Sequence, residues 1–437
     1  MSHDFRAPRT RRSFLTEGLG IVSLATTAPW FLDLTARGMA LPQETGGLPK
    51  ATGDIANRIL VVVQLGGGND GLNTVVPFGD GGYYDARPQL SIPEPGKAGG
   101  CLPLSGTTGL GLHPAMSDLA SLFDDGRVTI VQGVGYPNPN RSHFTSMDIW
   151  HTARNNAGGD GWIGRYFDCT CNGKPVQDGA IAIGQSPPLA MQGVVQAPVA
   201  FEDAQLFQWL GRNIDRSLEE PYQEIMRAGV RPGVAPDSHA AFLARTVLDA
   251  QLSSDRVRRA LGRESLVSYP GSGLGRQMQS IGAIIRDGLS TRVYYAAISG
   301  FDTHAGQGPT QERLLGEFAA AMRAFQSDLD AQGNADRVMV MVFSEFGRRV
   351  GQNASQGTDH GTAAPLFLVG SSVRAGVLGQ HPSLVDLDQG DLKFSVDFRS
   401  VYAGVLSDWM GADAVTILGK SYPPAKVVAK ERRAART

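Results

Sequence analysis

Residues 58–71 read RILVVVQLGGGNDG, an apolar run that ends in three glycines and then Asn69-Asp70. A run this rich in β-branched residues predicts a strand that is buried on both faces of a sheet. Four similar runs follow, at residues 128–134, 291–299, 337–344 and 365–370. Between them, the spacing of apolar residues predicts helices at residues 113–124, 277–287, 311–332 and 397–410. The alternation predicts an α/β fold, with a mostly parallel sheet and helices on both faces.

Residues 41–425 read as one domain, because no internal repeat or low-complexity block divides them. The strand–helix rhythm is interrupted at about residues 201–270, where predicted helices are joined by a Pro/Gly-rich link at residues 229–236. We expect this segment to be a helical insertion on the sheet. Residues 426–437 are basic and polar, which predicts a frayed tail.

Residues 1–40 have the three parts of a secretory signal. Arg11-Arg12 is followed by Ser-Phe-Leu, then by an apolar stretch at residues 18–32, and then by small residues up to Ala40. The arginine pair is typical of the twin-arginine pathway, so we expect the twin-arginine translocase as a partner during export. The mature protein would then be periplasmic or secreted. A basic disordered tail is the alternative interpretation.

Composition narrows the choice of partners. The 437 residues are 42% hydrophobic and 19% charged, with a formal net charge of −2. This balance gives no electrostatic footprint for nucleic acid or an anionic membrane, and the apolar stretch at residues 18–32 is too short for a permanent span. Of the three cysteines, Cys169 and Cys171 are too close for an unstrained disulfide. A bond from Cys101 to one of them, or three free thiols, both remain open.

Polar residues gather where the predicted strands end. Ligands of such sheets bind outside the carboxyl ends of the strands, so these residues are the candidates for chemistry. They include carboxylates, three histidines and a serine: Asp70, Arg141, Ser142, His143, Asp302, His304, Glu345, Asp359 and His360. The sequence therefore predicts that they cluster at one edge of the sheet.

The glycine run admits three interpretations. Residues 66–71 satisfy the pattern G-x-G-x-x-G, but a dinucleotide site needs a helix that opens at the motif, and Pro77 disfavours one. The second interpretation is a sharp turn that delivers Asp70 to a metal ion. The third is an aspartate in a turn that caps backbone amides.

The pairs Asp302/His304 and Asp359/His360 indicate a metal site. Carboxylate and imidazole suit one or two divalent ions, zinc or manganese being the expected metals. Glu345 follows an apolar strand and could be a metal ligand, a general base or an ion-pair partner of Arg348 or Arg349.

Ser142 precedes a predicted helix, where it is a good N-cap. Beside a metal it could instead be an activated nucleophile, with the helix amides holding an anionic substrate. Arg141 would then pair with a tetrahedral anion.

The chain resembles a large bacterial family of twin-arginine-exported proteins that is named only as a domain of unknown function. The resemblance covers about residues 58–411 and rests on the runs LGGGNDGLNTVVPFGD, GYPNPNRSHFTSMDIW, FDTHAGQ, FSEFGRR, TDHGTAAPLFLVG and DFRSVYAGVL. That family is grouped with the alkaline-phosphatase-like superfamily, which includes sulfatases and nucleotide pyrophosphatases.

The resemblance implies an order of site residues. In the superfamily an Asp after the first strand, a Ser or Thr nucleophile at a helix start, and later Asp and His residues hold two metals. Asp70, Ser142, Asp302/His304, Glu345 and His360 follow that order. Phe346 stands where the superfamily has a metal-binding His, so a ligand is missing unless His143 or Asp359 replaces it. A second alignment, with Asp359-His360 as the Asp-His pair, leaves only His381 as the last His.

Two functions follow from this. The first is an exported metal-dependent hydrolase of phosphate esters, with Ser142 as nucleophile and Arg141 and Asn69 holding the non-bridging oxygens. Sulfate esters are less favoured, because no sulfatase-type Cys or Ser followed by x-Pro-x-Arg surrounds position 142. The alternative is a non-catalytic exported binding or assembly protein that retains the fold.

Overall fold

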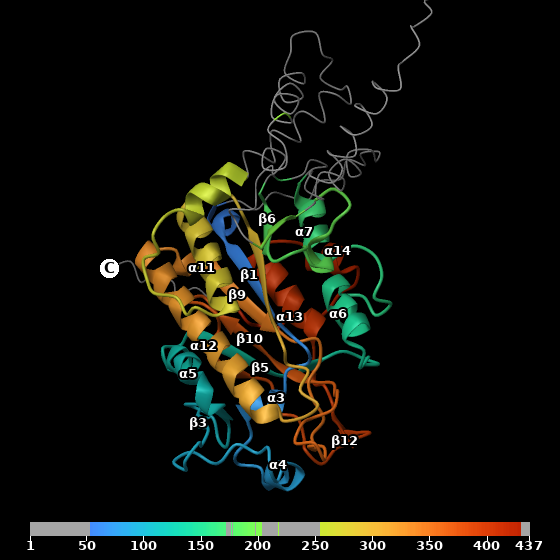
Figure 1. Cartoon of the computed structure of the whole chain (residues 1–437). Coiled ribbons are helices and arrows are strands. Elements are labelled where there is room, and N and C mark those ends of the chain that lie inside the picture. The colour runs from blue at the N-terminus through green and yellow to red at the C-terminus, as the bar shows by residue number, and fades with distance from the viewer. Residues whose placement is uncertain are drawn as a thin grey trace, which may run out of the picture. The chain divides into compact units, whose positions relative to one another are not determined.

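The computed structural model describes residues 53–171, 176, 178–196, 198–202, 217 and 254–429. The chain divides into a larger compact unit, residues 42–202 and 260–437, and a smaller one, residues 1–41 and 203–259. The larger unit contains the sheet (Figure 1). The expected export signal at residues 1–40, most of the expected insertion and residues 430–437 of the expected tail lie outside the described residues.

Within the described residues, one sheet is built from nine strands: β1 (Ile59–Gly66), β5 (Val128–Gly135), β6 (Ala180–Ile183), β7 (Val199–Phe201), β8 (Val293–Ser299), β9 (Val338–Phe343), β10 (Ala364–Val369), β11 (Gly376–Leu378) and β14 (Val396–Asp397). Their order is β11-β5-β10-β9-β1-β8-β6-β7, and β14 also pairs with β5. Parallel pairing joins all neighbours except β10, which is antiparallel to both β5 and β9. The mostly parallel sheet is confirmed.

The reversed direction of β10 decides what meets at the sheet edge. Because β10 alone is reversed, β5 still runs parallel to β9 and β1. The residues that precede β10 therefore lie at the same edge as the residues that follow β1, β5, β8 and β9. His360, which comes before β10, thus joins the groups at the carboxyl ends of the other strands.

Helices cover both faces of the sheet, as predicted (Figure 1). On one side lie α5 (Ser117–Asp124), α11 (Gly273–Arg286) and α12 (Gln307–Gln332). On the other side lie α6 (His143–Thr152), α7 (Trp162–Thr170), α13 (Phe398–Gly404), which a π-helical turn continues over Val405–Trp409, and α14 (Ala414–Leu418). None of the helices in the described part of the chain is long and apolar enough to cross a membrane.

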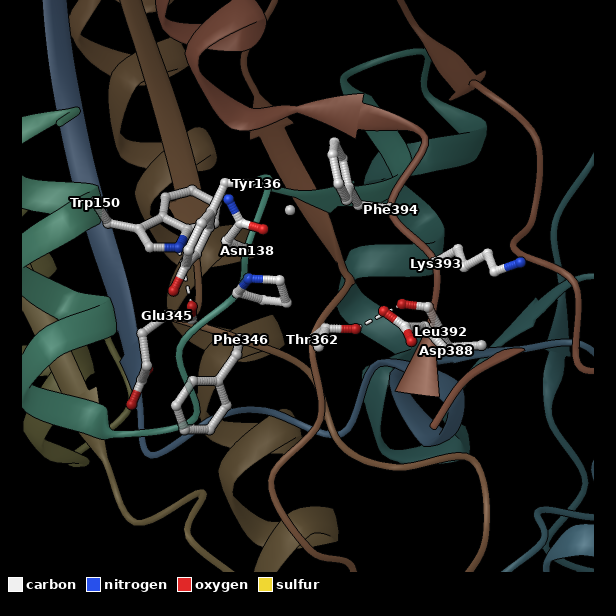
Figure 2. Close-up of a pocket in the computed structure, with 12 residues that line it drawn as sticks. Tyr136, Asn138, Trp150, Glu345, Phe346, Thr362, Asp388, Leu392, Lys393 and Phe394 are labelled. Carbon is white, nitrogen blue, oxygen red and sulfur yellow. Dashed lines mark hydrogen bonds between the residues drawn. The ribbon is translucent and has the colours of Figure 1, made fainter. Parts of the chain in front are cut away.

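Smaller elements surround the carboxyl edge of the sheet. The segment after β1 contains α3 (Gly71–Thr74), α4 (Gly81–Ala86) and a three-stranded sheet of β2 (Val75–Val76), β4 (Gly111–Leu112) and β3 (Leu102–Pro103). Further along the chain, β12 (Leu387–Asp388) and β13 (Asp391–Leu392) form a hairpin. Residues of this hairpin line a cavity together with residues that follow β5 (Figure 2).

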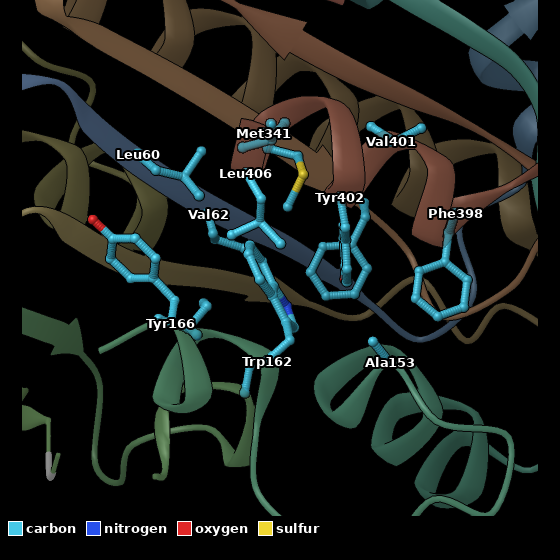
Figure 3. Packing of buried hydrophobic residues seen from close by; sticks show 14 of the residues in the cluster. Leu60, Val62, Ala153, Trp162, Tyr166, Met341, Phe398, Val401, Tyr402 and Leu406 are labelled. Carbon is cyan, nitrogen blue, oxygen red and sulfur yellow. The ribbon is translucent and has the colours of Figure 1, made fainter. Parts of the chain in front are cut away.

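The face of the sheet under α6, α7 and α13 holds a large apolar core (Figure 3). Leu60, Val62 and Met341 project from β1 and β9 against Trp162 and Tyr402, and all five are almost fully buried. Burying one such side chain stabilises the fold by roughly 1.5–3 kcal/mol.

Elsewhere in the larger unit, Cys101 is a buried free thiol, so it forms no disulfide.

Candidate metal centre

Three imidazole rings converge on one carboxylate oxygen at the carboxyl edge of the sheet. The Nε2 atoms of His304 and His360 each lie 3.1 Å from Asp302 Oδ1, and His143 Nε2 lies 3.4 Å from it. His143 begins α6, Asp302 and His304 follow β8, and His360 precedes β10. Four predicted site residues from three segments therefore meet at one point.

The opposite nitrogen of each ring contacts a hydrogen-bond acceptor. His143 Nδ1 lies 2.7 Å from Glu345 Oε1, and His304 Nδ1 lies 3.1 Å from Asp359 Oδ1. The third contact joins His360 Nδ1 to the carbonyl oxygen of Arg141 at 2.8 Å. Carboxylate and carbonyl oxygens only accept, so in the neutral rings each Nδ1 carries the proton. Each Nε2 then turns its lone pair toward Asp302, the arrangement found around metal-bound histidines.

This donor set fits a divalent cation. His304 Nε2 and His360 Nε2 are only 2.9 Å apart, and two lone pairs at that distance repel unless a proton or a cation lies between them. His143 Nε2 is buried and has no hydrogen-bond partner among the described residues. His143, Asp302 and His360 offer ligand atoms within 4.8 Å of one another. Two imidazoles with a carboxylate suit zinc or manganese, and His304 could add a third imidazole.

Arg348 holds Asp302 from behind. Its guanidinium is fully buried and donates to Asp302 Oδ1 at 2.8 Å, to Gly68 O at 2.6 Å and to Thr358 O at 2.9 Å. Burial raises the pKa of Asp302, but the hydrogen bond and positive charge of Arg348 outweigh burial and hold that pKa well below its ordinary value. The carboxylate is therefore ionised and suited to a cation.

Glu345 is almost fully buried and orients His143. Besides the His143 ring, its carboxylate accepts hydrogen bonds from Gly67 N at 2.9 Å and from the Ser344 hydroxyl at 3.2 Å. The hydrogen bond to Glu345 is the main reason why the pKa of His143 is raised. Asp359 contacts Nδ1 of His304, and this contact lowers the pKa of Asp359. The expected ion pair with Arg348 does not form, because Arg348 pairs with Asp302. The roles of Glu345 as metal ligand or general base stay predictions.

Phe346 forms an apolar wall behind the rings. It is buried, and its ring centroid lies 4.8 Å from that of His143 and 5.0 Å from that of His360. Gly68 makes room for it, since a Cβ at that position would come within 2.3 Å of the Phe346 ring. The phenyl group thus excludes water from one side of the imidazoles and offers no ligand atom.

Asp70 lies outside this cluster, contrary to the expectation that it binds a metal. Its Oδ1 caps α3 by accepting from Leu72 N and Asn73 N, and its Oδ2 accepts from Arg87 and Gln307, both at 2.5 Å. Both oxygens of this buried carboxylate are therefore occupied. A helix does open at Gly71, but it ends at Thr74, and Asp70 already caps it, which removes the basis for a nucleotide site.

Arg141 and Ser142 lie beside the cluster in the chain. The Arg141 guanidinium donates to the buried Asp391, so it is already paired. Ser142 is exposed at the N-terminus of α6, and its hydroxyl does not cap the helix. Asn69, expected to hold substrate oxygens, is buried and bonds to Thr74 at 2.9 Å.

Sequence reasoning missed two residues that shape the site. The sequence suggests Arg348 only as a partner of Glu345, and no spacing marks its contact with Asp302, which lies 46 residues earlier in the chain. Asp391 lies in a polar stretch where nothing marks it, and only the fold shows that its side chain is buried against Arg141.

Fold and site together define a class: an α/β protein with a histidine–carboxylate centre at the carboxyl edge of a mostly parallel sheet. Residues 119–387, more than half of the chain, match the family described as "Protein of unknown function (DUF1501)", and the chain belongs to that family. A comparison with curated proteins found no match.

Solved structures give only distant likenesses. The lipoteichoic acid synthase LtaP from Listeria monocytogenes is 9% identical, with 80% of this chain and 71% of that chain covered and a TM-score of 0.31. The PsFucS1 sulfatase from Pseudoalteromonas sp. is 10% identical, with 85% and 68% covered and a TM-score of 0.30. The phosphonate monoester hydrolase SpPMH from Silicibacter pomeroyi is 10% identical, with 70% and 72% covered and a TM-score of 0.26. At these scores the likenesses carry no argument about activity.

Proposed function

We propose that this protein is a metal-dependent hydrolase of phosphate esters, with sulfate esters less favoured. The observation that carries the proposal is the convergence of three imidazole Nε2 atoms on Asp302 Oδ1, with an acceptor at every Nδ1. His143, Asp302 and His360 would hold the ion, and His304 could complete the set. A bound divalent cation would supply Lewis-acid stabilisation of the negative charge that develops on the phosphoryl group.

Ser142 is the proposed nucleophile. It is exposed between Arg141, whose carbonyl contacts His360, and His143, and it stands at the N-terminus of a ten-residue helix whose free amides favour an anion. In the first step a bond forms from Ser142 Oγ to phosphorus while the bond to the leaving alcohol breaks. The serine proton passes to solvent, and the alcohol takes a proton from water. In the second step a water oxygen displaces Ser142 Oγ, which regains a proton.

A second candidate is an exported binding protein that holds a metal without turnover. The hydrogen bonds of Asp70 favour this second candidate. The superfamily resemblance assigns the Asp70 carboxylate to a metal, but both of its oxygens accept hydrogen bonds from Arg87, Gln307 and the amides of α3. This leaves the donors for one ion rather than two. The two candidates share the metal centre and differ in whether Ser142 reacts.

The test is ester hydrolysis by the full chain after chelation and reloading with zinc or manganese. We expect an aryl phosphate monoester to be cleaved only after reloading, and Ser142→Ala to reduce the rate to near the uncatalysed rate while metal binding persists. If metal binds and no phosphate or sulfate ester is cleaved, the binding protein is the function. If Ser142→Ala keeps full activity, the nucleophile is assigned wrongly.

Export by the twin-arginine route is part of the proposal and rests on Arg11-Arg12 and the apolar stretch after them. Replacing both arginines with lysine should leave the protein in the cytoplasm, as cell fractionation would detect. Undiminished export of that variant would contradict the route.

A further inference from the structure

A cavity of about 320 Å³ lies next to the metal centre. Its walls come from the end of β5 and the residues after it, from Glu345 and Phe346 after β9, and from the β12–β13 hairpin with the residues after it. The volume is at the small end of the range of ligand-binding pockets, about 300–1,000 Å³, and suits a single substituted ring.

Phe346 connects the cavity to the metal centre. Its ring lines the cavity and also packs against His143 and His360, with centroids 4.8 and 5.0 Å away. The ion pair between Arg141 and the buried Asp391 ties the wall after β5 to the hairpin wall. A ligand in the cavity would therefore lie one phenyl ring away from the imidazoles.

The lining indicates the chemistry of the ligand. Figure 2 shows the rings of Tyr136, Phe346 and Phe394 on different sides of the cavity, with the Asp388 carboxylate on the hairpin side. Aromatic faces stack on rings, and a carboxylate accepts hydrogen bonds from hydroxyl groups.

The charges that line the cavity exclude an anionic ligand group. Lys393 is the basic residue among the lining residues, and its ammonium pairs with Asp386. Asp388 would repel an anion, whereas the Glu345 carboxylate points away from the cavity toward His143. A ligand group without negative charge therefore fits, and a hydroxyl group that donates to Asp388 is such a group.

We propose that this cavity is a binding site for an uncharged ring that carries hydroxyl groups. If the proposed hydrolase function holds, this ring is the alcohol part of the ester. The aromatic walls select for a ring over a flexible chain, and Asp388 selects for hydroxyl donors over anionic substituents.

The experiment is calorimetric titration of chelator-treated protein with phenyl glucoside, an uncharged hydroxylated probe. We expect binding to wild type, and a loss of affinity of about five-fold or more in Phe394→Ala and in Asp388→Asn. The matched control is Phe144→Ala, because Phe144 is 85% exposed and is not among the lining residues. Phe394 and Asp388 are both partly or fully exposed, so these variants should fold, which circular dichroism checks.

The proposal is overturned if wild type does not bind phenyl glucoside, or if neither Phe394→Ala nor Asp388→Asn changes the affinity. It is also overturned if Phe144→Ala weakens binding as much as they do. The assay contains neither metal nor ester, so its outcome is independent of whether the protein hydrolyses phosphate esters.

Discussion

Asp302 shows how a single residue organises the candidate metal centre. One of its oxygens faces three imidazole nitrogens on the open side and the buried Arg348 guanidinium on the other. Arg348 offsets the cost of keeping this carboxylate charged and also fixes its direction, because the guanidinium is itself held by Gly68 O and Thr358 O. The carboxylate is thus held in a position that would suit a cation.

Replacing Asp302 with asparagine should lower the affinity for zinc by about a hundred-fold, because a charged ligand becomes a neutral one at nearly constant shape. Titration calorimetry of chelator-treated protein measures the change. The matched control is Asp359→Asn, since Asp359 contacts His304 at Nδ1, the nitrogen opposite the one that faces Asp302, and there we expect a loss of about ten-fold. Equal losses in the two variants would contradict the assignment of Asp302 as a ligand.

At the scale of elements, the glycine turn after β1 sets the shape of the centre. Gly67 and Gly68 adopt φ angles of 113° and 68°, which side-chain-bearing residues rarely adopt. The turn brings the carbonyls of both glycines to Arg348 and leaves space for Phe346. The sequence run GGG therefore serves packing and hydrogen bonding in this turn, and no phosphate site is formed by it.

Gly68→Ala should destabilise the protein by about 3 kcal/mol, because the new Cβ would lie 2.3 Å from the Phe346 ring in addition to the backbone strain. Gly106 is the matched control, with a φ of 73° and no atom within 4 Å of its Cβ position. Gly106→Ala should cost only about 1 kcal/mol. Chemical denaturation measures the free energy of unfolding of both variants. Equal losses of stability in the two would show that the Phe346 ring can move aside freely.

The sequence predicted the elements unevenly, for physical reasons. Five long apolar runs became β1, β5, β8, β9 and β10 within one or two residues at most ends. The short strands β6 and β7 were missed, because four and three residues carry too little pattern to stand out. The reversal of β10 was not predicted either, since a strand that is buried on both faces reads the same in both directions.

For the site, the sequence placed the candidates at one edge, and the structure brings His143, Asp302, His304 and His360 together there. The sequence did not distinguish the carboxylate that faces the three imidazole nitrogens from the carboxylates that orient the rings. That choice depends on side-chain direction across segments far apart in the chain, as for Glu345 and His143. Asp70 binds Arg87 and Gln307 and does not face the cluster. The positions of these two residues in the sequence do not indicate that they contact Asp70.

At the scale of the whole molecule, a buried histidine links folding to pH. His151 lies in the core, where its Nε2 contacts the Tyr295 hydroxyl at 3.0 Å, and Tyr295 donates to Gln64 at 2.6 Å. Burial lowers the pKa of His151 to about 4. In the unfolded chain the pKa of this residue is near 6.5. Between that pH and about 4, the unfolded chain therefore binds a proton at His151 and the folded protein does not.

We therefore expect the free energy of unfolding to fall as pH drops from about 6.5 to about 4, with His151 contributing about 3 kcal/mol of the loss. Stability above pH 6.5 is unaffected by this group. His151→Gln should flatten the pH dependence in that window, but not abolish it, because burial also lowers the pKa of His113 to about 4. Urea denaturation at several pH values measures the slope. An unchanged slope would show that His151 does not control it.

Anomalous X-ray diffraction from crystals grown with zinc, and separately with manganese, tests the metal centre most directly. We expect one strong peak about 2.0–2.2 Å from the Nε2 atoms of His143 and His360 and from the Asp302 carboxylate. His304 Nε2 should be beside it, and the peak should be absent in crystals of Asp302→Asn. A peak elsewhere on the protein, or none at this edge of the sheet under either metal, would contradict the assignment of this cluster as a cation site.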